Sequence, residues 1–152
     1  EIPTCYHEDF GPDIHFVAQQ NQLSIDEVIS IHSNNEYLIY MLGFTPGYCY
    51  LGGMSEKIAA PRLSKPRTAV AAGSVGIAGT QTGIYPIESP GGWQLIGRTP
   101  LDLYNPAREE NPILLEAGNY IRFLPITKEE YRDIQQNINQ NCYQVKKYLK
   151  RI

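Results

Sequence analysis

The stretch TAVAAGSVGIAGTQTGIYPIESPGGWQLIGRTP, residues 68–100, decides the fold. Glycine and proline divide it into short apolar runs, and these two residues are the strongest local signals for turns. Several short strands with turns between them are typical of a β-sandwich or a small β-barrel. We therefore predict strands at four places in this stretch: 68–72, 75–78, 83–87 and 93–96.

The flanking segments add two more strands and three helices. Residues 36–44 are aromatic, β-branched or long aliphatic, which predicts a buried strand, and 120–124 have the same character. After Asp13, apolar residues recur at helical spacing and predict a first short helix. Ser24 and Thr127 each begin an S/T-x-x-E capping box, which predicts a second helix to about residue 32 and a third helix from 127 onward. The third helix is expected to pack outside the sheet.

The composition limits the class of protein. The chain has 152 residues, 42% of them hydrophobic, which suits one domain over residues 1–152. Its net charge is −3 and its basic residues are scattered except near the end, so no nucleic-acid partner is expected. No apolar run approaches the roughly 18 to 20 residues of a membrane span, so no membrane partner is expected. Three widely spaced cysteines fit a reducing cytoplasm better than a disulfide scaffold.

The usual catalytic and cofactor motifs are missing from the sequence. The glycines between 73 and 83 match neither the dinucleotide nor the Walker pattern, and turns or barrel corners explain them better. The histidines and cysteines lack metal-ligand spacing, so we predict no metal site. For Cys49, in a glycine-rich loop, a buried thiol is favoured over a nucleophile. For His32, a capping or core role is favoured over catalysis.

Aromatic, proline and long polar side chains alternate in four segments: 44–48, 66–67, 81–86 and 93–98. Aromatic faces give apolar contact area, Gln and Arg give directional hydrogen bonds, and glycines let a ligand approach the backbone. Such a set is suited to lining a groove. The alternative is that Trp93 and Tyr85 fill a barrel interior while the prolines close turns, and composition leaves both open.

Two long segments carry a family resemblance: GFTPGYCYLGGM at 43–54 and PRLSKPRTAVAAGSVGIAGTQTGIYPIESPGGWQLIGRTP at 61–100. They resemble the large C-terminal domain of the allophanate hydrolase subunit 1 family, which includes the B component of 5-oxoprolinase and an inhibitor of a sporulation kinase. The resemblance implies a cyclophilin-like β-barrel, mainly β with peripheral helices. It also implies a smaller N-terminal domain ahead of this one, which the absence of an initial methionine fits. The sequence departs from the family at Ala71, where proline is usual and would fix the turn, and at Tyr48-Cys49.

The resemblance also implies a function. It points to the B component of a bacterial 5-oxoprolinase, acting with cognate subunits A and C in the ATP-dependent conversion of 5-oxoproline to glutamate. The chain has no ATP motif, so ATP is expected on a partner subunit and no cofactor in this chain. Urea or allophanate chemistry, known for other members, stays open.

The site candidates follow from this substrate. We hypothesise that Trp93 forms a wall of the groove and that Arg98 offers a cationic fork to a carboxylate. The catalytic or positioning candidates are Arg67, Gln81, Tyr85 and Arg98. The groove for substrate or partner comprises Phe44, Thr45, Pro46, Gly47, Tyr85, Pro86 and Trp93. Thr45 and His32 are secondary catalytic candidates, and no general base is assigned.

Two other functions remain open from the sequence. The first is a regulatory protein that binds a histidine kinase and blocks its autophosphorylation, with the same groove holding a proline or an apolar side chain of a kinase helix. The second is prolyl isomerisation, which rests on likeness of fold alone.

Overall fold

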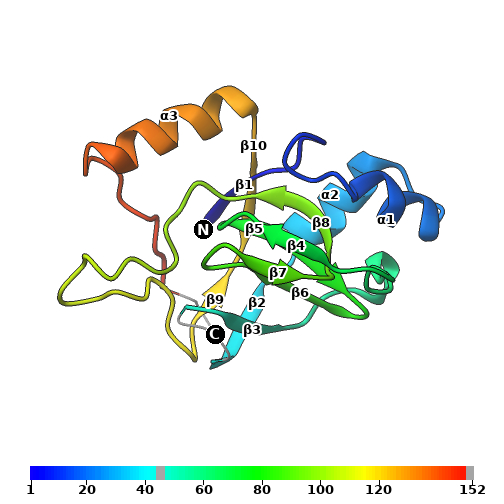
Figure 1. The fold of residues 1–152 in the computed structure, drawn as a ribbon, viewed down its shortest axis with the longest axis horizontal. Coiled ribbons are helices and arrows are strands. Elements are labelled where there is room, and N and C mark those ends of the chain that lie inside the picture. Colours follow the sequence, from blue (N-terminus) through cyan, green and yellow to red (C-terminus); the bar gives the residue numbers. More distant parts are fainter. Residues whose placement is uncertain (44–46, 150–152) are drawn as a thin grey trace.

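The computed structural model describes residues 1–43 and 47–149 and is mainly β, with three α-helices (Figure 1). The α-helices are α1 (Ile14–Gln20), α2 (Ile25–Ser33) and α3 (Lys128–Asn139). A short 3-10 helix, η1 (Glu56–Ile58), lies between β3 and β4. All three predicted helices are confirmed. In Figure 1, α1 and α2 lie together on one side of the strands, and α3 lies apart from them beyond the end of β10.

Local capping chemistry explains where two of these helices begin. The Ser24 side chain accepts a hydrogen bond from the Glu27 amide, and the Glu27 side chain accepts one from the Ser24 amide. Thr127 and Glu130 repeat the same exchange at α3. Each box satisfies backbone donors that the first helical turn leaves free, which fixes the helix start.

The strands form three hydrogen-bonded sheets within the described residues. The five-stranded sheet has the order β10-β1-β8-β5-β6, the three-stranded sheet β3-β2-β9, and the two-stranded sheet β4-β7. Their bounds are β1 (Ile2–Cys5), β2 (Tyr37–Leu42), β3 (Cys49–Gly52), β4 (Arg67–Val70), β5 (Ser74–Ala78), β6 (Gln81–Ile84), β7 (Ser89–Gly91), β8 (Gln94–Arg98), β9 (Tyr120–Ile121) and β10 (Phe123–Ile126).

The predicted strands are present, with shifted ends. The strand expected at 83–87 is β6 and ends at Ile84, because pairing with β5 sets its limits and Pro86 has no N–H for a ladder. The strand expected at 120–124 is divided into β9 and β10, which pair with different sheets. Three strands were not among those predicted: β1 in the opening segment, β3, where a loop was expected, and β7, which contains proline and glycine.

The two faces of the five-stranded sheet are covered differently. Val75, Ile77 and Ile84 belong to the main core, which also contains buried residues of α1, α2 and the three-stranded sheet. We call the opposite face the outer face; there Val70 of β4, Tyr85 and Leu95 form a second, smaller core. Side chains from β4, from the residue after β6 and from β8 thus pack together on the outer face, where the candidate site lies.

Among the described residues, no helix is both long enough and apolar enough to cross a membrane.

Candidate functional site

Trp93 lies over a pair of glycines on the outer face. Gly76 of β5 and Gly83 of β6 are direct partners across the hairpin. A Cβ at Gly83 would lie 3.2 Å from Cζ3 of Trp93, and a Cβ at Gly76 would lie 3.0 Å from its Cβ. A side chain at Gly83 would press against the indole, and one at Gly76 against the Cβ of Trp93, so the two glycines form a flat floor on which Trp93 rests.

Tyr48 extends this site across the sheets. Its ring meets Trp93 edge-on, with centroids 6.4 Å apart and planes at 86°. The ring of Tyr50 follows 5.3 Å from Tyr48, and that of Tyr40 lies 6.2 Å from Tyr50. We call these four side chains the aromatic row. It offers a run of partly exposed ring faces and edges from β2 to the start of β8.

Tyr85 lies beside the row and is almost buried, with 7% of its surface exposed. It packs with Val70 and Leu95, and Trp93 packs against the same cluster. Burial raises the pKa of Tyr85, so its phenol stays protonated at neutral pH. Tyr85 is therefore a buried, neutral hydroxyl next to Trp93, in the second core on the outer face and not in the main core.

Arg67 is engaged in an ion pair. Its two terminal nitrogens each lie 2.8 Å from one carboxylate oxygen of Asp13, and the pair is largely buried. Asp13 also accepts a hydrogen bond of 2.7 Å from the Leu95 amide. This pairing raises the pKa of Arg67, which keeps its charge fixed on Asp13. The Asp13 carboxylate thus joins the start of α1 to β4 and to β8.

Arg98 lies at one end of β8, between its register partners Ser74 and Cys5. Its guanidinium carbon is 5.0 Å from the centre of the Phe10 ring, and Phe10 stacks on Tyr131 at 4.5 Å. Burial raises the pKa of Tyr131, and the positive charge of Arg98 opposes that rise. The Nε of Arg98 and the Oγ of Ser74 are buried without a hydrogen-bond partner among the described residues. Arg98 is held by aromatic contacts at this end of the sheet.

Gln81 lies at the opposite end. It pairs with Ala78, the last residue of β5, whereas Arg98 pairs with Ser74, the first. The two ends of this five-residue strand are about 13 Å apart. Gln81 is exposed and shares the strand face of Gly83, on the Trp93 side. The structure does not bring Arg98 and Gln81 together as the substrate hypothesis expected.

The remaining groove candidates divide into two groups. Phe44, Thr45 and Pro46 lie outside the described residues. Gly47 has a φ of +82° and lies against Pro86, whose Cβ would be 3.2 Å from a Cβ at position 47. Both are buried, so this contact closes the loop before β3 and presents no polar group.

His32 is fully buried in the main core. Thr82 donates its hydroxyl proton to the Gly76 carbonyl at 2.9 Å, so it accepts from Nε2 of His32 at 2.9 Å. Nδ1 then accepts from the Tyr6 hydroxyl at 2.6 Å. Burial lowers the pKa of His32 to about 3, so the ring is neutral. Its place in this chain of hydrogen bonds agrees with the core role favoured above.

Cys49 is a buried thiol on β3, a strand where a loop was expected. Burial raises its pKa to about 12, which leaves almost no thiolate at neutral pH. Within the described residues, no group of three or more His, Cys, Asp or Glu side chains is arranged to hold a metal ion.

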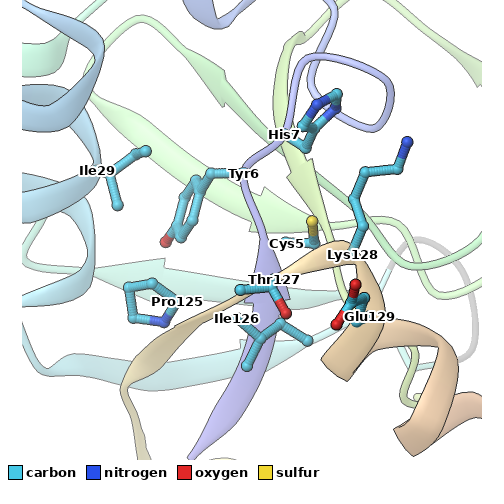
Figure 2. Close-up of a pocket in the computed structure, with 9 residues that line it drawn as sticks. All are labelled: Cys5, Tyr6, His7, Ile29, Pro125, Ile126, Thr127, Lys128 and Glu129. Atoms are coloured by element: carbon cyan, nitrogen blue, oxygen red, sulfur yellow. The ribbon is translucent and has the colours of Figure 1, made fainter.

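A cavity of about 600 Å³ lies away from the outer-face site, at the end of β1 (Figure 2). Figure 2 shows Tyr6, Ile29 and Pro125 grouped on one side, and Lys128 and Glu129 at the start of α3 on the other. Lys128 is paired with Asp9 at the surface. The walls are mainly apolar.

Two features of the outer-face site were not predicted from the sequence. The first is the pairing of Asp13 with Arg67, because the two residues are far apart in the chain and no local pattern joins them. The second is the place of Tyr48, which belongs to an aromatic segment but was not selected as a candidate. The closeness of Tyr48 to Trp93 depends on how β3 and β6 meet in space.

These strands, and the site on them, belong to a domain type that recurs in larger enzymes. The chain belongs to the carboxyltransferase domain family, subdomain C and D, whose family model matches residues 1–115.

Individual relatives agree with this assignment. The chain is 58% identical over 139 residues to the B subunit of 5-oxoprolinase from Bacillus subtilis, which covers 91% of this chain and 58% of that protein. Urea amidolyase of Saccharomyces cerevisiae is more distant, at 28% identity over 88% of this chain and 8% of that protein. A solved structure of a conserved Pyrococcus horikoshii protein is 58% identical, with a TM-score of 0.82 over 86% of this chain and 60% of that chain. The chain thus spans less than two thirds of the length of the Bacillus and Pyrococcus relatives.

Proposed function

We propose that this chain is the corresponding part of a 5-oxoprolinase B subunit. The observation that carries the proposal is the high identity to the Bacillus subtilis protein over nine-tenths of the chain. The more distant likeness to urea amidolyase supports the same broad chemistry, because that enzyme's name also indicates action on a small amide. Acting on 5-oxoproline means opening a lactam to give glutamate.

We propose that subunits A and C supply what this chain lacks. ATP would bind to a partner subunit, since the sequence contains no nucleotide motif. The Bacillus subtilis relative is itself one subunit of an enzyme, which supports an assembly of several chains. We place the assembled enzyme in the cytoplasm, in accord with three cysteines that form no disulfide in the described residues. We also propose that a smaller N-terminal domain precedes this one, in accord with the greater length of the relatives.

We propose, too, that the sheets form a cyclophilin-like barrel. Two contacts support this arrangement. The edge strand β3 of one sheet lies alongside the edge strand β6 of the other. At the opposite edges, β9 continues into β10 after a single residue. The sheets would then follow one another around a common core.

The catalytic roles of Arg67, Gln81, Tyr85 and Arg98 remain predictions. Gln81 and Tyr85 lie on the Trp93 side of the sheet, which supports a direct part for them. Arg67 and Arg98 have structural partners, so we propose that they act by positioning.

The test is reconstitution of the full-length protein with its cognate A and C subunits. We expect glutamate release and 5-oxoproline-dependent ATP hydrolysis that both require this chain, with Gln81→Ala lowering the rate. Lys57→Gln is the control, because this side chain is exposed on η1. Folded and bound subunits that release no glutamate would overturn the function. Equal rates in wild type and Gln81→Ala would overturn the role of Gln81 only.

A further inference from the structure

Arg62 is fixed beside Trp93 by the backbone on either side of it. The Leu63 amide donates a hydrogen bond of 2.7 Å to the Gly92 carbonyl. The Gln94 side chain donates one of 2.8 Å to the Pro61 carbonyl. The residues before and after Arg62 are therefore tied to the residues before and after Trp93. Arg62 does not depend on a flexible loop for its place.

The charge of Arg62 is available to a ligand. Its side chain is exposed, and no described residue forms an ion pair or hydrogen bond with it. No aspartate or glutamate occurs from residue 57 to residue 87, so the local sequence offers no competing carboxylate. The nearby Arg67 differs in this respect, because Asp13 occupies both of its terminal nitrogens.

Two neutral phenols lie within electrostatic range of this charge. Burial is the main cause that raises the pKa of Tyr48 and of Tyr85, and the positive charge of Arg62 opposes the rise at both. The Tyr48 hydroxyl also lies beside the glycine floor, 3.3 Å from where a Cβ of Gly83 would be. Arg62, Tyr48 and Trp93 thus lie in the same part of the outer face.

We propose that Arg62, Tyr48 and Trp93 form the binding site for a small lactam that carries a carboxylate, and that Arg62 determines specificity for that carboxylate. This inference rests on the proposed function and names the residues that would recognise its substrate. The guanidinium suits a carboxylate because it can donate two parallel hydrogen bonds. The phenol can donate to the ring carbonyl, and the indole gives apolar contact to the ring.

Trp93 is the only tryptophan of the chain, so its fluorescence reports directly on the site. Titration with 5-oxoproline is expected to change the emission saturably. The same lactam ring without the carboxylate, 2-pyrrolidone, is expected to bind at least about tenfold more weakly, because a charged hydrogen-bonded pair is lost. Arg62→Gln is expected to weaken 5-oxoproline binding by a similar factor while leaving 2-pyrrolidone unchanged.

Lys65→Gln is the matched control, because Lys65 is an exposed cation of the same segment. It is expected to bind 5-oxoproline within about twofold of wild type, since a screened surface charge contributes little. The inference is overturned if Lys65→Gln loses as much affinity as Arg62→Gln, if Arg62→Gln binds normally, or if 5-oxoproline never alters the wild-type emission, with or without the partner subunits.

Turnover in the reconstituted enzyme separates this inference from the proposed function. A wild-type enzyme that releases glutamate, with an unchanged KM in Arg62→Gln, overturns the inference and leaves the function standing. An assembled wild-type enzyme that binds 5-oxoproline at Trp93 but releases no glutamate overturns the function and leaves the site standing. A raised KM with a nearly unchanged kcat supports both.

Discussion

Asp13 and Arg67 are joined by two parallel hydrogen bonds of 2.8 Å, although they belong to the start of α1 and to β4. The same carboxylate also accepts from the Leu95 amide of β8. It therefore holds a helix and two sheets in one place, next to the outer-face site. Arg67, which the sequence analysis selected as a catalytic or positioning candidate, thus has a structural ion-pair partner.

Asp13→Asn is expected to lower the free energy of unfolding by about 2 kcal/mol, because a largely buried guanidinium loses its charged partner. Urea unfolding measures the change. Glu36→Gln is the control: the Glu36–Arg122 pair is about half exposed, and its loss should cost less than about 0.5 kcal/mol. Equal losses in the two variants would contradict the structural role of Asp13.

The neutral state of His32 makes stability depend on pH. The unfolded imidazole takes up a proton near pH 6.5, whereas the folded one does so only near pH 3. The stabilisation from keeping His32 neutral in the folded protein is thus fully present above about pH 6.5. The free energy of unfolding should fall as pH decreases from 6.5 toward 3, by up to about 1.4 kcal/mol per pH unit.

Urea unfolding at several pH values tests this dependence. His32→Gln should show a smaller decline between pH 6.5 and 4 than wild type, because its side chain does not titrate. His15→Gln is the matched control and should keep the wild-type decline, because it removes an exposed histidine and leaves the buried His32 in place. A decline in His32→Gln as steep as that of wild type would refute this origin.

Gly83→Ala tests the floor under Trp93. The added methyl would lie 3.2 Å from the indole and should push it toward water. We expect emission at longer wavelength and a loss of about 1–3 kcal/mol in stability. Gly43→Ala is the control, because no atom of the described residues lies within 4 Å of its Cβ position. Unchanged emission in Gly83→Ala would mean that Trp93 does not rest on this glycine.

The three thiols should differ in reactivity. Cys142 is exposed, whereas Cys5 and Cys49 are buried, and burial raises the pKa of Cys49 to about 12. A thiol reagent near pH 8 should modify one cysteine rapidly in the folded protein and the other two only on unfolding. Cys142→Ser should remove the rapid phase. Rapid modification of Cys49, located by mass spectrometry, would contradict its burial.

Parts of the fold could be predicted because their causes are local. Each capping box, at Ser24 and at Thr127, forms its hydrogen bonds within four consecutive residues, so the local sequence is enough to predict the helix start. Both helices start where expected. Strands β3 and β7 escaped prediction because their short sequences contain glycine or proline. They form strands because β3 pairs with β2 and β7 pairs with β4 in the folded chain.

The same distinction applies to the site. Trp93 and Tyr85 could be selected from sequence, because aromatic residues placed among glycines and prolines are a local signal. The separation of Arg98 from Gln81 could not, since it depends on the register of β5 with its two neighbours. The availability of Arg62 could not either, because only the fold shows which arginine of this segment meets a carboxylate.

The paired glycines under Trp93 also bear on how this surface can evolve. A bulky side chain at 76 or 83 excludes the indole, and a small residue at 93 leaves the strands without their cover. No single substitution among the three positions is neutral, so a viable new arrangement needs compensating changes. Residues 76, 83 and 93 should therefore be inherited together, and across related sequences they should covary more strongly than their distance along the chain would suggest.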